Sequence, residues 1–330
     1  MYHERWRMKF KLSKSYVDYI KPSLLFVFII IIMVRVPIFL KPSNIISVLA
    51  QGATIGIVSI GMTMVILSGE IDISVGAQLY CTGAIASEVF LATKSILITT
   101  LAAIVAGAIF GLLNGIGVAK LKIPSMITTL AVSNILTGLA SLLIGSGSTL
   151  IAGDEYKVIS QTKIFGILSS TWIFILLYVV FAIIICKTRF GRYVYAVGDN
   201  KDALRAAGIN VDFIQIAIFV LTGMLCGVGG LVSTSRLGGS QINLSIGTEI
   251  YCIAAVVIGG VSMSGGVGNI FGVLVGIFMV AALDNLLRLI SVSAYLYDLV
   301  WGIVIFVVVL IDVLKKKQQI KNQERKIPEL

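Results

Sequence analysis

Apolar segments long enough to cross a membrane follow one another along nearly the whole chain of 330 residues. A helix needs roughly 20 apolar residues to span a bilayer, and hydrophobic residues make up 58% of this chain. Only 13% of its residues are charged, whereas a soluble domain carries about 25%. The alternating pattern of a β-barrel is absent, so we expect helices, which satisfy their own backbone polar groups in hydrocarbon.

The apolar segments predict an all-α integral membrane domain of about ten transmembrane helices over residues 23–313. Tails at 1–22 and 314–330 flank this domain. The first apolar run is expected to be retained as a span, because no small-residue cleavage site follows it. The predicted spans are residues 23–40, 44–67, 73–92, 96–118, 124–145, 170–187, 213–235, 248–262, 268–289 and 294–313.

Lysine and arginine are distributed unevenly between the two predicted sides of the membrane. With the N-terminus inside, both tails and the connections near 68–72, 119–123, 188–212 and 263–267 are cytoplasmic. These pieces, together with Lys187 at the end of the span 170–187, hold nineteen Lys and Arg residues, against six outside. The positive-inside rule therefore predicts a multi-pass membrane protein with both termini in the cytoplasm, and helical spans are the default in a cell membrane of the bacterial inner-membrane type. The net charge of +10 is attributed to this topology and to lipid headgroups, and no nucleic-acid partner is expected.

Two short motifs interrupt the apolar pattern in the same way. GEIDISVG at 69–76 is matched by SQINLSIG at 240–247, and GAIFGLLNG at 107–115 is matched by GNIFGVLVG at 268–276 at six of nine positions. The matches occur in the same order, which predicts that five helices occur twice. Because five is odd, the second copy enters the membrane from the opposite side, an inverted repeat common in transporters. The predicted halves are residues 23–145 and 170–313.

The two interrupting motifs supply candidate residues for a translocation path or gate. Substrate sites of inverted-repeat transporters lie where helices are interrupted at corresponding positions, and a carboxylate in hydrocarbon requires a cavity or a partner. The alternative is that these side chains only cap the next helix by accepting from its free N–H groups. The sequence leaves both readings open. The candidates are Glu70, Asp72, Ser74, Gln241, Asn243, Ser245 and Glu249.

The longest predicted cytoplasmic connection, GRYVYAVGDNKDALRAAGINV at 191–211, predicts a short helix over Asn200–Ala207. Asn200 is a suitable N-cap and Gly208 a suitable stop. The helix would present a small apolar face that suits docking of a cytoplasmic partner. The alternative is a surface helix lying against lipid headgroups.

Glycines recur every four residues in two segments, a spacing that lets helix backbones approach closely. These predicted packing positions are Gly107, Gly111, Gly115, Gly268, Gly272 and Gly276. The glycine-rich run at 259–269 lacks the Gly-Lys-Ser/Thr of a phosphate-binding loop and is predicted to be a tight turn between helices. Asp284 and Arg288 lie four residues apart and are predicted to pair within one helix.

Three motifs in order resemble those of permeases of ribose-type ABC importers. GEIDISVG resembles the family's G-G-I-D-L-S-V-G signature, and the 191–211 connection resembles its cytoplasmic coupling loop. The run IAAVVIGGVSMSGGVGNIFG at 253–272 resembles a third family motif. The resemblance extends over about residues 42–312. It departs at Glu70, where the family usually has glycine.

The resemblance implies a permease subunit of an ATP-driven importer for a monosaccharide such as ribose, or for a related small polar solute. The implied partners are a second permease chain, a cytoplasmic ABC ATPase, an extracytoplasmic sugar-binding protein and membrane lipid. The permease itself would be no enzyme and would need no cofactor or metal. The helix that couples it to the ATPase would comprise Asn200, Lys201, Ala203, Leu204, Arg205, Ala206 and Gly208. The residues alone also allow an ion-coupled secondary transporter or a membrane scaffold without transport.

Overall fold

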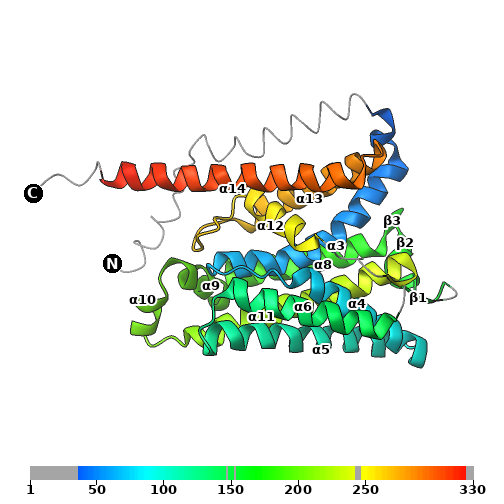
Figure 1. Ribbon diagram of the computed structural model, residues 1–330, viewed down its shortest axis with the longest axis horizontal. Helices are drawn as coiled ribbons and strands as arrows, with labels where there is room; N and C mark the ends of the chain where they lie inside the picture. The colour runs from blue at the N-terminus through cyan, green and yellow to red at the C-terminus, as the bar shows by residue number, and fades with distance from the viewer. Residues whose placement is uncertain (1–35, 146–147, 152–153, 242–246, 325–330) are drawn as a thin grey trace, which may run out of the picture.

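The computed structural model describes residues 36–145, 148–151, 154–241 and 247–324. Most of the first predicted span, 23–40, lies outside these residues, as do Asn243 and Ser245 of the second motif. Within them, the chain forms a bundle of long helices that run roughly along one direction and are joined by short connections (Figure 1).

Helices account for most of the described residues. In chain order, with the 3-10 turn η1 and the π-helical turn η2, they are η1 (Pro37–Leu40), α3 (Pro42–Leu67), α4 (Val75–Thr93), α5 (Ile96–Gly115), η2 (Ile116–Lys120), α6 (Ser125–Ile144), α7 (Val158–Gln161), α8 (Ser169–Lys187), α9 (Arg189–Asp199), α10 (Lys201–Ala206), α11 (Val211–Leu237), α12 (Thr248–Ile258), α13 (Ile270–Leu289) and α14 (Ala294–Glu324). Two small antiparallel sheets pair β1 (Ser148–Leu150) with β4 (Gly239–Gln241), and β2 (Lys163–Ile164) with β3 (Ile167–Leu168). The prediction of a helical protein is confirmed, with these two sheets as small additions.

Seven helices of the described chain are long and apolar enough to cross a membrane: α3, α4, α5 continued by η2, α6, α8, α11 and α13. The span predicted at 248–262 is wrong in length, because α12 ends at Ile258 before two glycines. Its 11 residues cover about 16 Å, roughly half of the hydrocarbon core. In contrast, α14 continues to Glu324, past the boundary predicted at residue 313, through a lysine- and glutamine-rich stretch that favours helix.

Helix α3 lies at the centre of the packed core. Every residue from Gly52 to Leu67 is buried, and the helix packs on α8, α11, α12 and α13. Large apolar side chains of α5, α6 and α8 are instead exposed, among them Leu101, Leu130 and Leu176. These exposed side chains suit contact with lipid tails, which are as apolar as leucine.

Glycines let the backbones of α5 and α11 approach each other closely. A Cβ added to Gly107 would lie 2.1 Å from the carbonyl oxygen of Gly223, and one added to Gly223 would lie 2.0 Å from that of Gly107. In the second glycine series, a Cβ on Gly276 would lie 2.0 Å from the carbonyl oxygen of Ala255 in α12. The predicted packing role is therefore confirmed at these positions.

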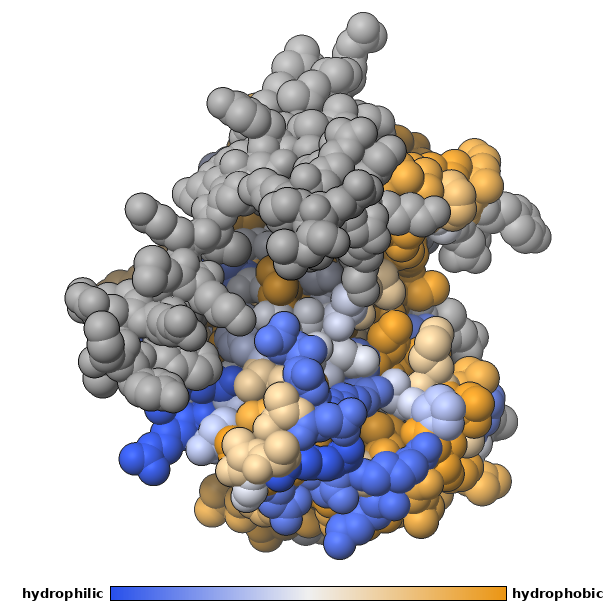
Figure 2. All heavy atoms as spheres, turned by 90° about the vertical axis from the view of Figure 1, so that its left-hand side faces the viewer, coloured by the Kyte–Doolittle hydropathy of each residue, from blue (hydrophilic) through white to orange (hydrophobic). Residues whose placement is uncertain are grey.

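Four connections meet at one end of the bundle, which we call the α10 end. They are the loop Ser68–Ser74, the link 121–124 between η2 and α6, the pair α9 and α10, and the α12–α13 turn 259–269. The N–H of Gly266 donates to the carbonyl oxygen of Leu67 at 2.8 Å, and a Cβ added to Gly198 would lie 2.0 Å from the same oxygen. All four segments are predicted to be cytoplasmic, and hydrophilic side chains gather on this end (Figure 2).

No element is predicted for residues 146–168, yet their described part folds onto the opposite end of α11. The Tyr156 side chain is fully buried, and its hydroxyl lies 2.7 Å from Oγ1 of Thr234. Strand β1 from this connection pairs with β4, which directly follows α11. This part of the fold depends on long-range contacts that hydropathy does not indicate.

Candidate functional site

The loop Ser68–Ser74 carries most of the first motif and separates α3 from α4. Helix α3 ends where the Ser68 hydroxyl donates back to the carbonyl oxygen of Val65 at 2.7 Å. The next residue, Gly69, has φ of 79°, a left-handed conformation that glycine adopts without steric cost. Helix α4 then begins at Val75, with Ser74 in the N-cap position. The motif therefore interrupts the apolar pattern as a real break between two helices.

Asp72 is completely buried in this loop. Its carboxylate accepts from the N–H and Oγ of Ser74 at 2.9 and 2.5 Å, and from the amides of Gln78 and Asn114 at 3.3 and 3.5 Å. Both amides also donate to Ser74 Oγ, at 2.8 and 2.7 Å. Asp72 thus satisfies a backbone donor at the start of α4, and it also belongs to a buried polar cluster that reaches α5. The amide oxygens of Gln78 and Asn114 have no hydrogen-bond partner within the described residues.

Helix α6 holds the backbone of the same loop. The N–H of Ile71 donates to Ser125 Oγ at 3.3 Å, and the N–H of Ile73 donates to Thr129 Oγ1 at 3.1 Å. Sequence reasoning missed these two hydroxyls and the two amides around Asp72. The signal that marks them is a polar residue in or at the start of an apolar segment, single at Gln78, Asn114 and Ser125 and next to a second threonine at Thr129.

The buried carboxyl of Asp72 predicts a dependence of stability on pH. Burial raises the pKa of Asp72 from 3.8 to about 6, against the opposing effect of its hydrogen bonds. The folded chain therefore binds a proton more tightly than the unfolded chain, and stability falls as pH rises from 3.8 through 6. The shift corresponds to roughly 3 kcal/mol. We expect Asp72→Asn to remove most of the difference between thermal unfolding midpoints measured at pH 5 and pH 8 in detergent.

Asp154 provides the control for this comparison, because its side chain is 91% exposed at the opposite end. Asp154→Asn should leave the pH dependence as it is in the unmodified chain. The same pH dependence in the Asp72→Asn variant would show that Asp72 does not titrate in this range.

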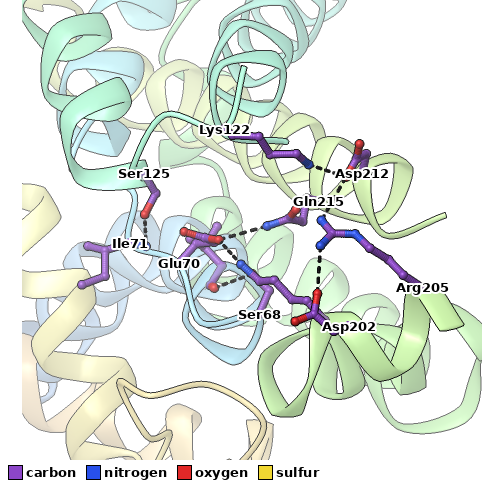
Figure 3. A network of polar contacts seen from close by, with 11 residues as sticks. Ser68, Glu70, Ile71, Lys122, Ser125, Asp202, Arg205, Asp212 and Gln215 are labelled. Carbon is purple, nitrogen blue, oxygen red and sulfur yellow. Dashed lines mark hydrogen bonds and ion pairs between the residues drawn. The ribbon is translucent and has the colours of Figure 1, made fainter. Parts of the chain in front are cut away.

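Glu70, two residues before Asp72, is directed toward α10 and the start of α11 (Figure 3). Its Oε1 accepts from Lys201 Nζ at 2.5 Å and from Gln215 Nε2 at 2.9 Å. These groups line a cavity of about 220 Å³, to which Lys122 and Arg205 also contribute. The first motif is thereby in contact with the predicted docking helix, 131 residues further along the chain.

Further ion pairs surround this contact. Asp212, in the first turn of α11, lies 2.7 Å from Lys122 and 3.5 Å from Arg205, measured between carboxylate oxygen and side-chain nitrogen. Arg205 also lies 3.2 Å from Asp202 within α10. The charged side chains around the Glu70 contact are therefore paired with one another. The contacts of Asp212 with Lys122 and Arg205 could not be assigned from the sequence, whereas Asp202 and Arg205 lie three residues apart in the predicted helix.

The short helix predicted over Asn200–Ala207 is confirmed as α10, Lys201–Ala206. Asn200 caps it by accepting from the N–H groups of Asp202 and Ala203 at 3.0 and 2.9 Å, and Gly208 follows with φ of 78°. Leu204 is half-buried against the core, whereas the other small apolar residues are exposed. The exposed residues are Ala203, Ala206 and Ala207. Helix α9, which directly precedes α10, was not predicted.

The described start of the second motif, at Gln241, lies away from the first motif. Gln241 ends β4 opposite Ser148, and Glu249 lies in the first turn of α12. Helix α11, 27 residues or about 40 Å long, separates Gln241 from the Glu70 contact at the other end. The structure therefore does not bring Gln241 together with Glu70 and Asp72.

Comparison with known proteins identifies the family of this chain. Residues 44–309 match the family model described as "Branched-chain amino acid transport system / permease component". The chain belongs to this permease family. The permease is 35% identical over 299 residues to the ribose import permease protein RbsC of Escherichia coli K12, covering 89% of this chain and 92% of that protein. Membership confirms the resemblance drawn from the three motifs.

Other relatives are similar over most of their length. The permease is 34% identical over 284 residues to the L-arabinose ABC transporter permease protein AraH of Azospirillum brasilense, covering 86% of this chain and 84% of that protein. It is 35% identical over 290 residues to RbsC of Bacillus subtilis, covering 87% and 90%. No solved structure matches the permease.

Proposed function

We propose that this permease is the transmembrane subunit of an ATP-driven importer for a pentose such as ribose or arabinose. The observation that carries the proposal is α10, a capped helix with small exposed apolar residues at the end of the bundle where the predicted cytoplasmic segments meet. The relatives named for ribose and L-arabinose support the choice of solute. The family description names branched-chain amino acids instead, so leucine is the appropriate competing solute in a test.

Helix α10 would dock into a groove of a separate ABC ATPase, which hydrolyses the ATP. Small side chains suit such a role, because Ala203, Ala206 and Ala207 leave the helix surface close to its backbone. The N-cap from Asn200 would keep α10 helical when a movement of the ATPase displaces it. The residues proposed for coupling are Asn200, Lys201, Ala203, Leu204, Arg205, Ala206 and Gly208, with Lys201 facing Glu70 rather than the partner.

An inverted repeat would relate the two halves of the permease. Under the exchange of α3 with α11, α4 with α12, α5 with α13 and α6 with α14, the packing of α5 on α11 corresponds to that of α13 on α3. The packing of α4 on α5 and α6 likewise corresponds to that of α12 on α13 and α14. This correspondence supports the repeat proposed from the sequence. The excess of lysine and arginine in the predicted inner segments supports a cytoplasmic position of both termini.

The translocation path would pass the two interruptions. Asp72 and Ser74 lie in a buried polar cluster with two amide oxygens that have no partner among the described residues, which suits recognition of hydroxyl groups. In the second half, Glu249 stands in the first turn of a short helix, and Gln241, Asn243 and Ser245 precede it. A second permease chain would complete the path, and an extracytoplasmic binding protein would deliver the sugar.

The test is purification of the tagged permease from its native membranes, identification of its partners and reconstitution in liposomes. We expect an ATPase and a binding protein to copurify, and uptake of radiolabelled ribose or arabinose to require ATP. Uptake of leucine instead would overturn the assignment of the solute. Uptake that follows an ion gradient in the absence of an ATPase would support the secondary-transporter alternative.

A further inference from the structure

We propose that the ion pair between Glu70 and Lys201 is the link through which α10 positions the loop Ser68–Ser74. The inference rests on the importer function proposed above and adds a specific route from the ATPase to the first motif. Glu70 and Lys201 are positioning residues in this route, because they act on the loop and not on the solute.

The geometry of the pair makes it a strong contact. Lys201 Nζ lies 2.5 Å from Glu70 Oε1, and only 11% of the Glu70 side chain is exposed. Partial burial limits screening by water and salt, which weakens exposed ion pairs. Gln215 of α11 donates to the same oxygen at 2.9 Å. The carboxylate is therefore held by two donors from two helices of the second half of the chain.

On its other side, the loop is tied to the first half. The backbone N–H groups of Ile71 and Ile73 donate to hydroxyls of α6, and the carboxylate of Asp72 lies among groups of α4 and α5. Glu70 and Asp72 are two residues apart, or at most about 7 Å along the chain. A displacement of Glu70 therefore also displaces Asp72 and the buried polar cluster around it.

Helix α10 has few other contacts through which it could move the first half of the chain. It packs on α9 and α11, and both belong to the second half of the chain. Among the described residues, Lys201 makes the direct polar contact from α10 to the first half. A second route is indirect, from Arg205 through Asp212 to Lys122. Movement of α10 would consequently reach the loop first through Lys201.

Glu70 is the position at which the first motif departs from the motif that it resembles. The resembling family usually has glycine at the position of Glu70, and glycine has no side chain that could reach Lys201. The cavity of about 220 Å³ beside the pair leaves room for both side chains to shift as the helix moves. Glu70, the residue that departs from the family motif, is therefore the residue that joins the motif to α10.

The experiment measures pentose molecules transported per ATP hydrolysed by the complete importer in proteoliposomes. We expect Glu70→Gln and Lys201→Gln each to lower this ratio at least fivefold, with ATPase rates within twofold of the unmodified complex. Lys201→Arg should keep the ratio, and the double exchange Glu70→Lys with Lys201→Glu should restore it to within twofold. Asp154→Asn is the matched control, because it breaks an exposed ion pair with Lys157 at the opposite end.

An unchanged ratio in both glutamine variants would overturn the proposal, and so would a parallel loss of ATPase and uptake, which indicates a purely structural role. Failure of the double exchange to restore the ratio in a folded complex would also overturn it. If that variant does not fold, the comparison of Lys201→Arg with Lys201→Gln decides. Failure of the importer function itself would appear separately, as absence of ATP-dependent pentose uptake in the unmodified complex.

Discussion

Replacing Ala203 with glutamate is expected to lower ATP-driven pentose uptake more than tenfold while the permease still folds. Ala203 is exposed on α10, so the longer side chain meets no obstacle within the permease. In the proposed ATPase groove, its carboxylate would lose water without gaining a partner, and for a charged group this costs more than the roughly 1–3 kcal/mol of a neutral one. Every 1.4 kcal/mol corresponds to about a tenfold change in affinity. Uptake and ATPase activity of reconstituted complexes measure the effect.

Two further variants separate docking from other causes. Ala203→Ser keeps the small size and should retain most of the uptake. Lys120→Glu changes the charge of an exposed residue near the same end but lies outside α10, and it should have little effect. Uptake by the Ala203→Glu variant at the unmodified rate would show that α10 does not enter a groove of the ATPase.

Gly198→Ala is expected to destabilise the permease by about 3 kcal/mol or more. An added Cβ would lie 2.0 Å from the carbonyl oxygen of Leu67 and 2.4 Å from the nitrogen of Gly266. Both are backbone atoms, so neither can turn away as a flexible side chain would. The end of α3, the end of α9 and the α12–α13 turn would all have to separate. The measurements are thermal unfolding in detergent and the yield of monodisperse protein.

Gly138→Ala is the matched control within α6, because an added Cβ there meets no atom within 4 Å. Alanine also favours helix over glycine by up to about 1 kcal/mol, so this variant should be at least as stable as the unmodified chain. A Gly198→Ala variant with an unchanged unfolding midpoint would mean that the three segments do not pack as closely as described.

Features encoded locally could be predicted from the sequence. Membrane insertion follows from hydropathy, and α10 follows from Asn200 and Gly208, whose capping preferences act within a few residues. The glycine spacing also indicated close packing, although it did not indicate that Gly107 meets Gly223. The grouping of the predicted cytoplasmic connections at one end followed from the succession of predicted spans, and the lysine and arginine count predicted that this end is cytoplasmic.

Features that depend on long-range contacts could not be predicted. The partner of Glu70 lies 131 residues away, and no local pattern connects the two side chains. The length of α12 was misjudged for a different reason, because the hydropathy of residues 248–262 extended the predicted span across Gly259 and Gly260, although the turn predicted from residue 259 already indicated an end at Ile258. One part of the role of Asp72 was predicted, because capping is a local effect. Its contact with Asn114 of α5 is a long-range one and was not predicted.

The shortness of α12 has a consequence for how the chain is made. A helix that covers about half of the hydrocarbon core gains too little free energy to enter the lipid from the aqueous translocation channel by itself. Helix α13 supplies the missing support, because Gly272 and Gly276 let it lie directly against the backbone of α12 at Gly259 and Ala255. During synthesis, α12 should therefore enter the lipid only after α13 has emerged, so that the two partition into the bilayer as one hairpin.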